Sequence, residues 1–209
     1  MEKKIKRKAI KIAMLGDSLV GKTSICIALR DNIYYEEKLT TIGQDKFETK
    51  ITLKNGEEIK LCIFDTAGQE RFHAIAVKAI RMVQGVVVVF DVTSRQTFEN
   101  VIKWLEEIEN SFNKVCIVLF GNKVDMEEKK REITEEEARK FAEEKKIPYF
   151  ETSAKTNKNI KEGFSRIVNE AYDMYEKIQD GIKLKKNKKV EKQKCCSGGE
   201  KDKNKKNVK

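Results

Sequence analysis

Short apolar runs separated by polar segments predict the strands of a buried sheet. The runs VVVVF and VCIVLF show no polar alternation, which is typical of strands that are covered on both faces. A hairpin is also expected, because Asn55-Gly56 stands between the strand-like segments FETKITL and EEIKLCIF. Besides FETKITL, the predicted strands are Ile10–Leu15, Ile59–Phe64, Val86–Phe90, Val115–Phe120 and Tyr149–Glu151.

Helical patterns alternate with these strands. Apolar residues recur three and four positions apart from Phe98 onward and again from Phe164 onward. Thr134 with Glu137 forms a capping box, which predicts that a further helix begins there. Alternating strands and helices with one hairpin predict a three-layer α/β fold, in which a six-stranded sheet is mostly parallel.

Composition places the excess charge at the two ends of the chain. The 209 residues include 44 Lys+Arg and 34 Asp+Glu, and the lysine surplus lies in the first and last segments. We therefore predict a basic extension at 1–9, one domain at 10–178 and a disordered tail at 179–209. Charge on flexible ends favours a membrane surface or an acidic partner over nucleic acid, and a purely solubilising role stays open.

The expected compartment is the cytoplasm. The first residues have no cleavage-site pattern, and no run approaches the roughly 20 apolar residues that span a bilayer. Cys26, Cys62 and Cys116 lie within apolar segments, so we expect them to be reduced core residues rather than a disulfide framework.

The segment GDSLVGKT has the spacing of a phosphate-binding loop. It follows the strand IKIAML and opens a helix, which is the context that such a loop requires. Its glycines let backbone N–H groups turn toward a polyphosphate. Lys22 would reach the β- and γ-phosphates, and the Thr23 hydroxyl would ligate Mg²⁺. The predicted phosphate site comprises Gly16, Asp17, Ser18, Leu19, Val20, Gly21, Lys22, Thr23 and Ser24.

The segment IFDTAGQERF adds the residues expected around the γ-phosphate. Asp65 ends an apolar strand, where its carboxylate can hold the Mg²⁺ shell. Gly68 allows close backbone approach to the phosphate, and Gln69 can orient a water for in-line attack.

The segments GNKVD and ETSAK predict the choice of base. The Asp125 carboxylate can accept hydrogen bonds from N1–H and the exocyclic amine of guanine, groups that adenine lacks. Asn122 is expected to brace the loops, and the stem of Lys123 to pack along the ring. From ETSAK we expect Ser153, Ala154 and Lys155 at the base, with the Ala154 amide at the guanine O6.

With these motifs the chain resembles the Ras superfamily of small GTPases, and its Rab branch most closely. GDSLVGKT, TTIG, DTAGQERF, VVVFDVT, GNKVD and ETSAK appear in the family order. The resemblance implies a switch between GTP and GDP that hydrolyses GTP slowly and regulates vesicle traffic. It would act at the cytosolic face of an intracellular membrane.

The resemblance also implies roles for single residues. Thr41 would join Thr23 and Asp65 at Mg²⁺, and Tyr34 would pack against guanine. The implied catalytic residues are Gln69, Lys22 and Thr41. Exchange factors, GTPase-activating proteins and effectors would contact the switch regions 35–47 and 66–82.

Three departures from the Rab pattern fall on an aromatic contact patch. Lys46 stands where an aromatic residue is usual, with Phe47 one position later. In a strand this offset points the ring to the opposite face, unless a bulge corrects it. Phe64 replaces a usual tryptophan, and Ala79 begins a segment in which a tyrosine pair is usual.

Two other functions stay open beside the switch. An adenine-nucleotide enzyme such as a small kinase is disfavoured by Asp125 and Ala154. A GTP-binding scaffold with impaired cycling or atypical effectors is disfavoured by the intact Gln69, Thr41 and Asp65, but the altered patch keeps it open.

The adjacent Cys195 and Cys196 suggest lipidation of the tail. The resemblance implies geranylgeranyl groups there, and two lipid chains give stable anchoring. Thirteen residues follow the pair, so it does not match a C-terminal C-a-a-X signal. We therefore expect acylation ahead of prenylation, with unmodified cysteines as the third outcome.

Overall fold

The protein is seen in a computed structural model that describes residues 9–35, 44–66, 83–111, 114–126 and 128–177. The chain divides into two compact units, Met1–Tyr172 and Asp173–Lys209. Of the second unit, residues 173–177 are described, and they are helical. The boundaries expected for the basic extension, the domain and the tail stay predictions, and the expected disorder of the tail lies outside the described residues.

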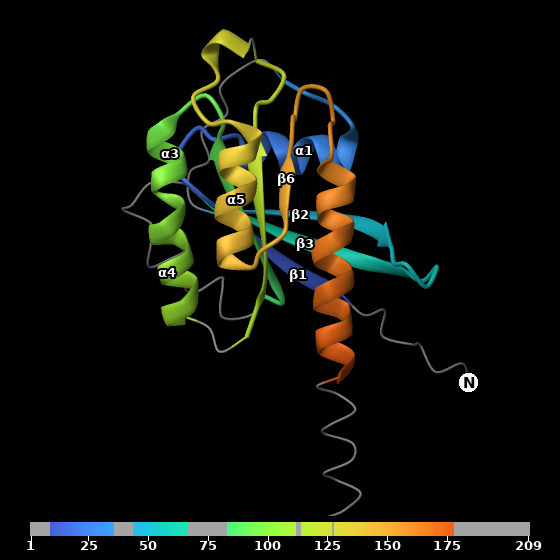
Figure 1. The fold of residues 1–209 in the computed structure, drawn as a ribbon. Helices are drawn as coiled ribbons and strands as arrows, with labels where there is room; N and C mark the ends of the chain where they lie inside the picture. Colours follow the sequence, from blue (N-terminus) through green and yellow to red (C-terminus); the bar gives the residue numbers. More distant parts are fainter. Residues whose placement is uncertain (1–8, 36–43, 67–82, 112–113, 127, 178–209) are drawn as a thin grey trace, which may run out of the picture. The chain divides into compact units, whose positions relative to one another are not determined.

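The first unit contains a six-stranded sheet with the strand order β2-β3-β1-β4-β5-β6 (Figure 1). All neighbouring strands pair in parallel except β2, which runs antiparallel to β3. The predicted fold class, a mostly parallel six-stranded sheet with one hairpin, is confirmed. The strands are β1 (Ala9–Leu15), β2 (Gln44–Thr52), β3 (Glu58–Thr66), β4 (Gly85–Asp91), β5 (Cys116–Asn122) and β6 (Tyr149–Glu151).

The hairpin between β2 and β3 closes where Asn55-Gly56 predicted it. The Gly56 N–H donates to the Leu53 carbonyl at 2.9 Å, and the Leu53 N–H donates to the Glu57 carbonyl at 2.8 Å. Gly56 has φ +82, a left-handed value that glycine adopts without a steric penalty. This is a turn followed by a left-handed residue, one of the common short hairpin connections.

The helices agree with the predicted spacing, with one break. They are α1 (Lys22–Asp31), α3 (Arg95–Glu99), α4 (Val101–Ser111), the 3₁₀ turn η2 (Glu128–Lys130), α5 (Glu135–Lys145) and a C-terminal helix at 160–177. The pattern that starts at Phe98 is divided between two helices at Asn100. Ile102 is 43% exposed, whereas Trp104 is buried. Thr134 caps α5 as predicted, because its side chain accepts from the Glu137 N–H at 3.2 Å.

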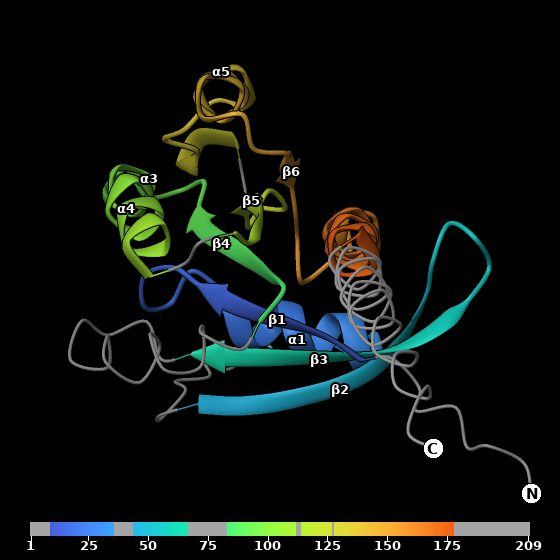
Figure 2. The same cartoon turned by 90° about the horizontal axis from the view of Figure 1, so that it is seen from below.

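Two hydrophobic clusters cover the two faces of the sheet and form the three predicted layers. One joins β1, β3 and β4 to α1 and the C-terminal helix up to Tyr172. The other joins β1, β4 and β5 to α3, α4 and α5. Figure 2 shows the strands in this order, with α3 and α4 on one side and the helix from residue 160 on the other. The fully buried β4 explains why VVVVF has no polar alternation.

The one-residue offset at Phe47 is real. The register of β2 against β3 runs without interruption from Gln44–Thr66 to Thr52–Glu58, so no bulge corrects it. Phe47 is 8% exposed and belongs to the cluster under α1, whereas Lys46 lies on the other face and pairs with Glu48 at 2.5 Å. A lysine therefore stands on the face where the Rab pattern has an aromatic ring.

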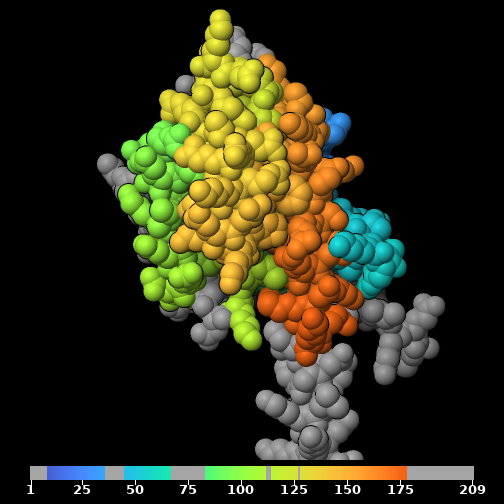
Figure 3. Space-filling model, in the orientation of Figure 1, coloured from blue at the N-terminus to red at the C-terminus, as the bar shows by residue number. Residues whose placement is uncertain are grey.

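The two ends of the parallel strands differ in character. A shallow pocket of about 630 Å³ lies at the amino ends of β5 and β6, where Ile117, Pro148 and Arg166 line it. On the face drawn in Figure 3, α5 and the helix from residue 160 flank one another there. The segments that carry the predicted chemistry follow the opposite, carboxyl ends. In the described part of the chain, no helix is long and apolar enough to cross a membrane.

Candidate functional site

The loop from Gly16 to Gly21 joins β1 to α1 and depends on its two glycines. Gly16 has φ +136, and a Cβ there would come within 2.1 Å of the Val89 carbonyl oxygen. Gly21 has φ +98, and its Cβ would meet the Asn122 Nδ2 at 2.4 Å. Gly21 is also the N-cap of α1 and makes no side-chain cap. The backbone N–H groups that begin α1 therefore face this loop without competition from a capping side chain.

Lys22 folds its ammonium group back over the loop. Its side chain is buried, and Nζ donates to the carbonyls of Gly16 at 2.9 Å and Asp17 at 2.7 Å. Burial lowers the pKa of Lys22 to about 8, although the carboxylates of Asp65 and Asp17 oppose this shift. The ammonium group is thus held against two carbonyls of the loop.

Thr23 and Asp65 meet beside Lys22. The Thr23 hydroxyl donates to the Asp65 Oδ2 at 2.5 Å, and Asp65 is fully buried at the end of β3. The next residue, Thr66, donates to the Met14 carbonyl at 2.8 Å and fixes this strand end to β1. A carboxylate next to a hydroxyl supplies the oxygen ligands that Mg²⁺ prefers, so the donor set fits this ion.

The described residues and the predicted metal ligands overlap only in part. No group of three or more His, Cys, Asp or Glu side chains gathers among the residues that the structure describes. Thr41, Gly68 and Gln69 lie outside the described residues, as do most of the segments 35–47 and 66–82. Tyr34 is described and is 39% exposed beyond the end of α1.

Asn122 connects the phosphate loop to the predicted guanine segments. It is buried at the end of β5, and its Nδ2 donates to the Val20 carbonyl at 2.8 Å. Its Oδ1 accepts from the Thr152 hydroxyl at 3.3 Å. One amide side chain thus joins three segments that are far apart in the sequence.

Asp125 and Ser153 form the second contact between the guanine segments. The Ser153 hydroxyl donates to the Asp125 Oδ1 at 2.6 Å and accepts from the Thr156 N–H at 3.1 Å. Asp125 is exposed and Ala154 is buried. The structure brings these residues together at the carboxyl end of the sheet, whereas their binding of a nucleotide stays a prediction.

Asp91 supports this site and was not singled out from the sequence. Its Oδ2 lies 2.5 Å from the Lys123 Nζ, and its Oδ1 accepts from the N–H and hydroxyl of Thr93 at 2.9 and 2.7 Å. Asp91 therefore fixes the direction of the Lys123 stem. A polar residue that directly follows the apolar run VVVVF was the available signal.

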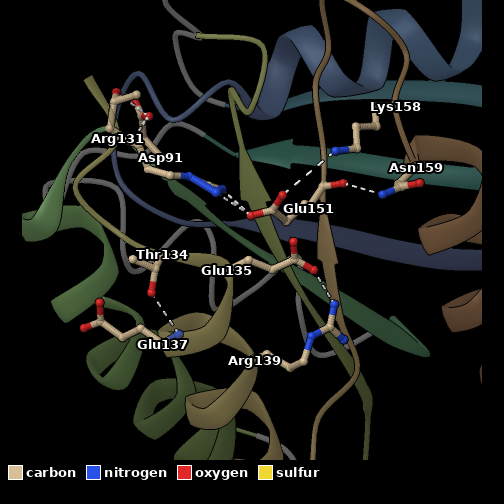
Figure 4. Close-up of polar contacts among 10 residues, drawn as sticks. Asp91, Arg131, Thr134, Glu135, Glu137, Arg139, Glu151, Lys158 and Asn159 are labelled. Carbon is tan, nitrogen blue, oxygen red and sulfur yellow. Dashed lines mark hydrogen bonds and ion pairs between the residues drawn. The ribbon is translucent and has the colours of Figure 1, made fainter. Parts of the chain in front are cut away.

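Glu151, the first residue of ETSAK, connects this segment to Arg131 and Asn159 (Figure 4). Its carboxylate binds the Arg131 guanidinium, and its backbone carbonyl accepts from the Asn159 Nδ2 at 2.7 Å. Burial raises the pKa of Glu151, and Arg131 opposes this shift. These contacts tie the segment that follows β6 to the end of η2, next to GNKVD.

Comparisons with known proteins agree with this arrangement. A sequence profile of the Ras family matches residues 11–173. Ras-related protein RABE1e of Arabidopsis thaliana is 36% identical over 205 residues, which cover 90% of this chain and 92% of that protein. Ras-related protein Rab-10 of Diplobatis ommata is 42% identical over 165 residues, with 78% and 82% covered. Ras-related protein Rab-15 of Homo sapiens is 35% identical over 176 residues, with 84% and 82% covered.

A family profile matches most of the chain, and the relatives match over 82–92% of their own length. The chain belongs to the Ras family and is a Rab-type small GTPase, which binds guanine nucleotide, hydrolyses GTP and regulates membrane traffic.

Proposed function

We propose that this GTPase is a Mg²⁺-dependent switch in which Lys22, Thr23 and Asp65 serve the phosphates and Asp125 selects guanine. The observation that carries the proposal is the hydrogen bond from the Asn122 Nδ2 to the Val20 carbonyl. It holds the base-reading segment and the phosphate loop in one fixed relation. A ligand with a base at one end and phosphates at the other matches that relation.

Guanine selection would depend on the hydrogen-bond acceptors that the Asp125 carboxylate has left over. The Ser153 hydroxyl donates one hydrogen bond to the Asp125 Oδ1. A carboxylate accepts about four hydrogen bonds over its two oxygens. The carboxylate thus has room for the two N–H donors that guanine presents side by side. Adenine would leave it without those donors, and an unmatched polar group costs orders of magnitude in affinity.

Mg²⁺ would supply charge neutralisation between the β- and γ-phosphates when the nucleotide is bound. The Thr23 hydroxyl and the buried Asp65 carboxylate would hold it, with Thr41 as a further proposed ligand. Lys22 would turn its ammonium group from the loop carbonyls to the phosphates. We assign Gly68 to close approach at the γ-phosphate and Gln69 to orientation of the attacking water.

The proposed partners follow from the same cycle. Segments 35–47 and 66–82 would change with the γ-phosphate and present different surfaces to exchange factors, GTPase-activating proteins and effectors. Lys46 is exposed on β2 within the first segment, so any partner would meet a charged group there. A GTP-binding scaffold that does not cycle is not favoured by the relatives, which are Ras-related proteins.

The lysine-rich tail is proposed to hold the protein at the cytosolic face of an intracellular membrane. Its lysines would be attracted to anionic lipid, and acylation of Cys195 and Cys196 would prolong the association.

The test of the base assignment is the substitution Asp125→Asn. The new amide donates to the carbonyl at position 2 of xanthine, so the variant should prefer xanthosine diphosphate. The parent should prefer GDP by at least about a hundredfold. Competition between the two nucleotides measures both preferences.

Asp31→Asn is the matched control, because Asp31 is the last residue of α1 and forms an ion pair with Arg30 at the protein surface. It should keep the preference of the parent for GDP. If Asp125→Asn lost stability without a change of base preference, Asp125 would be a loop residue and the assignment would be wrong.

A further inference from the structure

Asp17 in the phosphate loop is bound through both of its carboxylate oxygens. The Asn100 Nδ2 donates to Oδ2 at 2.7 Å, and the Trp104 Nε1 donates to Oδ1 at 2.8 Å. These partners lie 83 and 87 residues away in the sequence. Asn100 lies between α3 and α4 and Trp104 lies in the first half of α4, and this part of the chain carries none of the nucleotide-binding motifs described above.

Contacts other than those with Asp17 also hold the two donor side chains in place. Trp104 is 7% exposed within the cluster of α3, α4 and α5, so packing fixes the direction of its indole N–H. The Asn100 Oδ1 accepts from the Gln96 Nε2 at 3.3 Å and from the Lys103 Nζ at 3.1 Å. Because these contacts occupy the oxygen end of the amide, the Nδ2 end faces the loop.

Lys22 holds the backbone of the same loop. The Asp17 and Gly16 carbonyls both accept from the Lys22 Nζ, as described above. The side chain of Asp17 is therefore tied to α4, while its backbone is tied to α1. Ser18 and Leu19, which follow directly, are exposed and make the outer part of the loop. Asp17 is the point at which this outer part is fixed to the rest of the fold.

We propose that Asp17, Asn100 and Trp104 form a tether that positions the phosphate loop for guanine nucleotide. Asp17 acts here as a positioning residue, since its carboxylate points to the helix donors and not to the proposed phosphate site. Without the tether the loop would sample conformations in which its N–H groups do not converge. Bound nucleotide would then leave faster. The inference rests on the proposed function of this loop.

The test compares the dissociation rate of a fluorescent GDP analogue from four full-length proteins in Mg²⁺. They are the parent, Asp17→Asn, Trp104→Phe and the double variant. Asp17→Asn replaces one acceptor oxygen with an NH₂ group, which then faces an N–H donor of Asn100 or Trp104. Trp104→Phe removes the indole N–H but keeps an aromatic ring in the core. Each single change should raise the dissociation rate by about tenfold, the typical effect of one hydrogen bond to a charged group.

The double variant should release the analogue no more than about twice as fast as the faster single variant. Residues that act through one interaction are not additive. Leu105→Ala is the matched control, because Leu105 is 7% exposed on the same helix, packs in the same cluster and has an apolar side chain that cannot donate to Asp17. It should lower the free energy of unfolding while the dissociation rate stays at the parent value.

A spectroscopic measurement separates positioning from general stability. Trp104 is the single tryptophan of the chain, so the tryptophan emission of the protein reports on the surroundings of this one side chain. The parent and Leu105→Ala should change emission when chelation of Mg²⁺ removes the nucleotide, and Asp17→Asn should not. Retention of this change in Asp17→Asn, or dissociation within twofold of the parent in either single variant, would overturn the tether. A parent that binds no guanine nucleotide would instead overturn the proposed function.

Discussion

At the residue scale, Leu19 is the strained member of the phosphate loop. It has φ +64 and is 54% exposed, so a branched apolar side chain occupies a left-handed conformation without burial to offset the cost. That conformation costs an L-residue roughly 1–2 kcal/mol, and glycine adopts it freely but loses more entropy on folding. The strain is local to the part of the loop beyond Asp17.

Leu19→Gly should therefore raise the free energy of unfolding by about 0.5–1 kcal/mol. Urea unfolding at several GDP concentrations, extrapolated to zero nucleotide, separates this effect from any change in affinity. Leu19→Ala is the control, because alanine removes the side chain but keeps the unfavourable φ. Equal stability gains in both variants would place the cost in the leucine side chain and not in the backbone.

Single residues of the site were predictable where a motif names them and unpredictable where a distant contact does. The motifs single out Lys22, Thr23, Asp65 and Asp125 because their spacing from neighbouring glycines and strands is fixed locally, and their roles stay predictions. The contact of Asp17 with Trp104 spans 87 residues, and no local pattern encodes it. Trp104 is buried in the cluster of α3, α4 and α5, and its indole N–H also binds the loop.

At the element scale, the register of β2 decides which side chains the sheet presents. Phe47→Ala should lower the free energy of unfolding by about 3 kcal/mol, because it removes a nearly buried ring from the cluster under α1. Lys46→Ala should have a much smaller effect, since Lys46 is exposed in an ion pair with Glu48. Chemical denaturation of both variants in saturating GDP measures the difference. Similar losses in the two variants would contradict the uninterrupted register.

The elements themselves were predictable because their apolar periodicities are strong. All six strands appear within a few residues of the predicted segments, since fully buried strands leave unbroken apolar runs. The division between α3 and α4 was not foreseen. Phe98, Leu105 and Ile108 fit one continuous helix, whereas the structure ends α3 at Glu99 and begins α4 at Val101, with Asn100 between them in contact with Asp17.

At the scale of the whole molecule, the proposed membrane association is electrostatic before any lipid is attached. The unlipidated full-length protein should bind phosphatidylserine vesicles at low salt and dissociate as salt rises. Replacing Lys183, Lys185, Lys186, Lys188 and Lys189 with glutamine should weaken binding at least about a hundredfold, at roughly 1 kcal/mol per lysine. Vesicle co-sedimentation measures the partition.

A double change of Cys195 and Cys196 to serine is the control for the charge effect. It should leave vesicle binding of the unlipidated protein unchanged, because no lipid is present to lose. Binding that did not respond to salt or to the lysine replacements would rule out the electrostatic account. Mass spectrometry of the tail peptide from its native source would then identify the attached group.

The central claim, that this chain is a GTP-hydrolysing switch, is tested most directly by single-turnover phosphate release from bound GTP. The parent should release phosphate at roughly 10⁻⁴–10⁻³ s⁻¹ in Mg²⁺, as expected without an arginine supplied by an activating protein. Chelation of Mg²⁺ should abolish release, and Gln69→Leu should slow it at least about tenfold. Gln193→Leu in the tail, the matched control, should keep the parent rate. Equal rates in the parent and Gln69→Leu, or equal hydrolysis of ATP and GTP, would contradict this account.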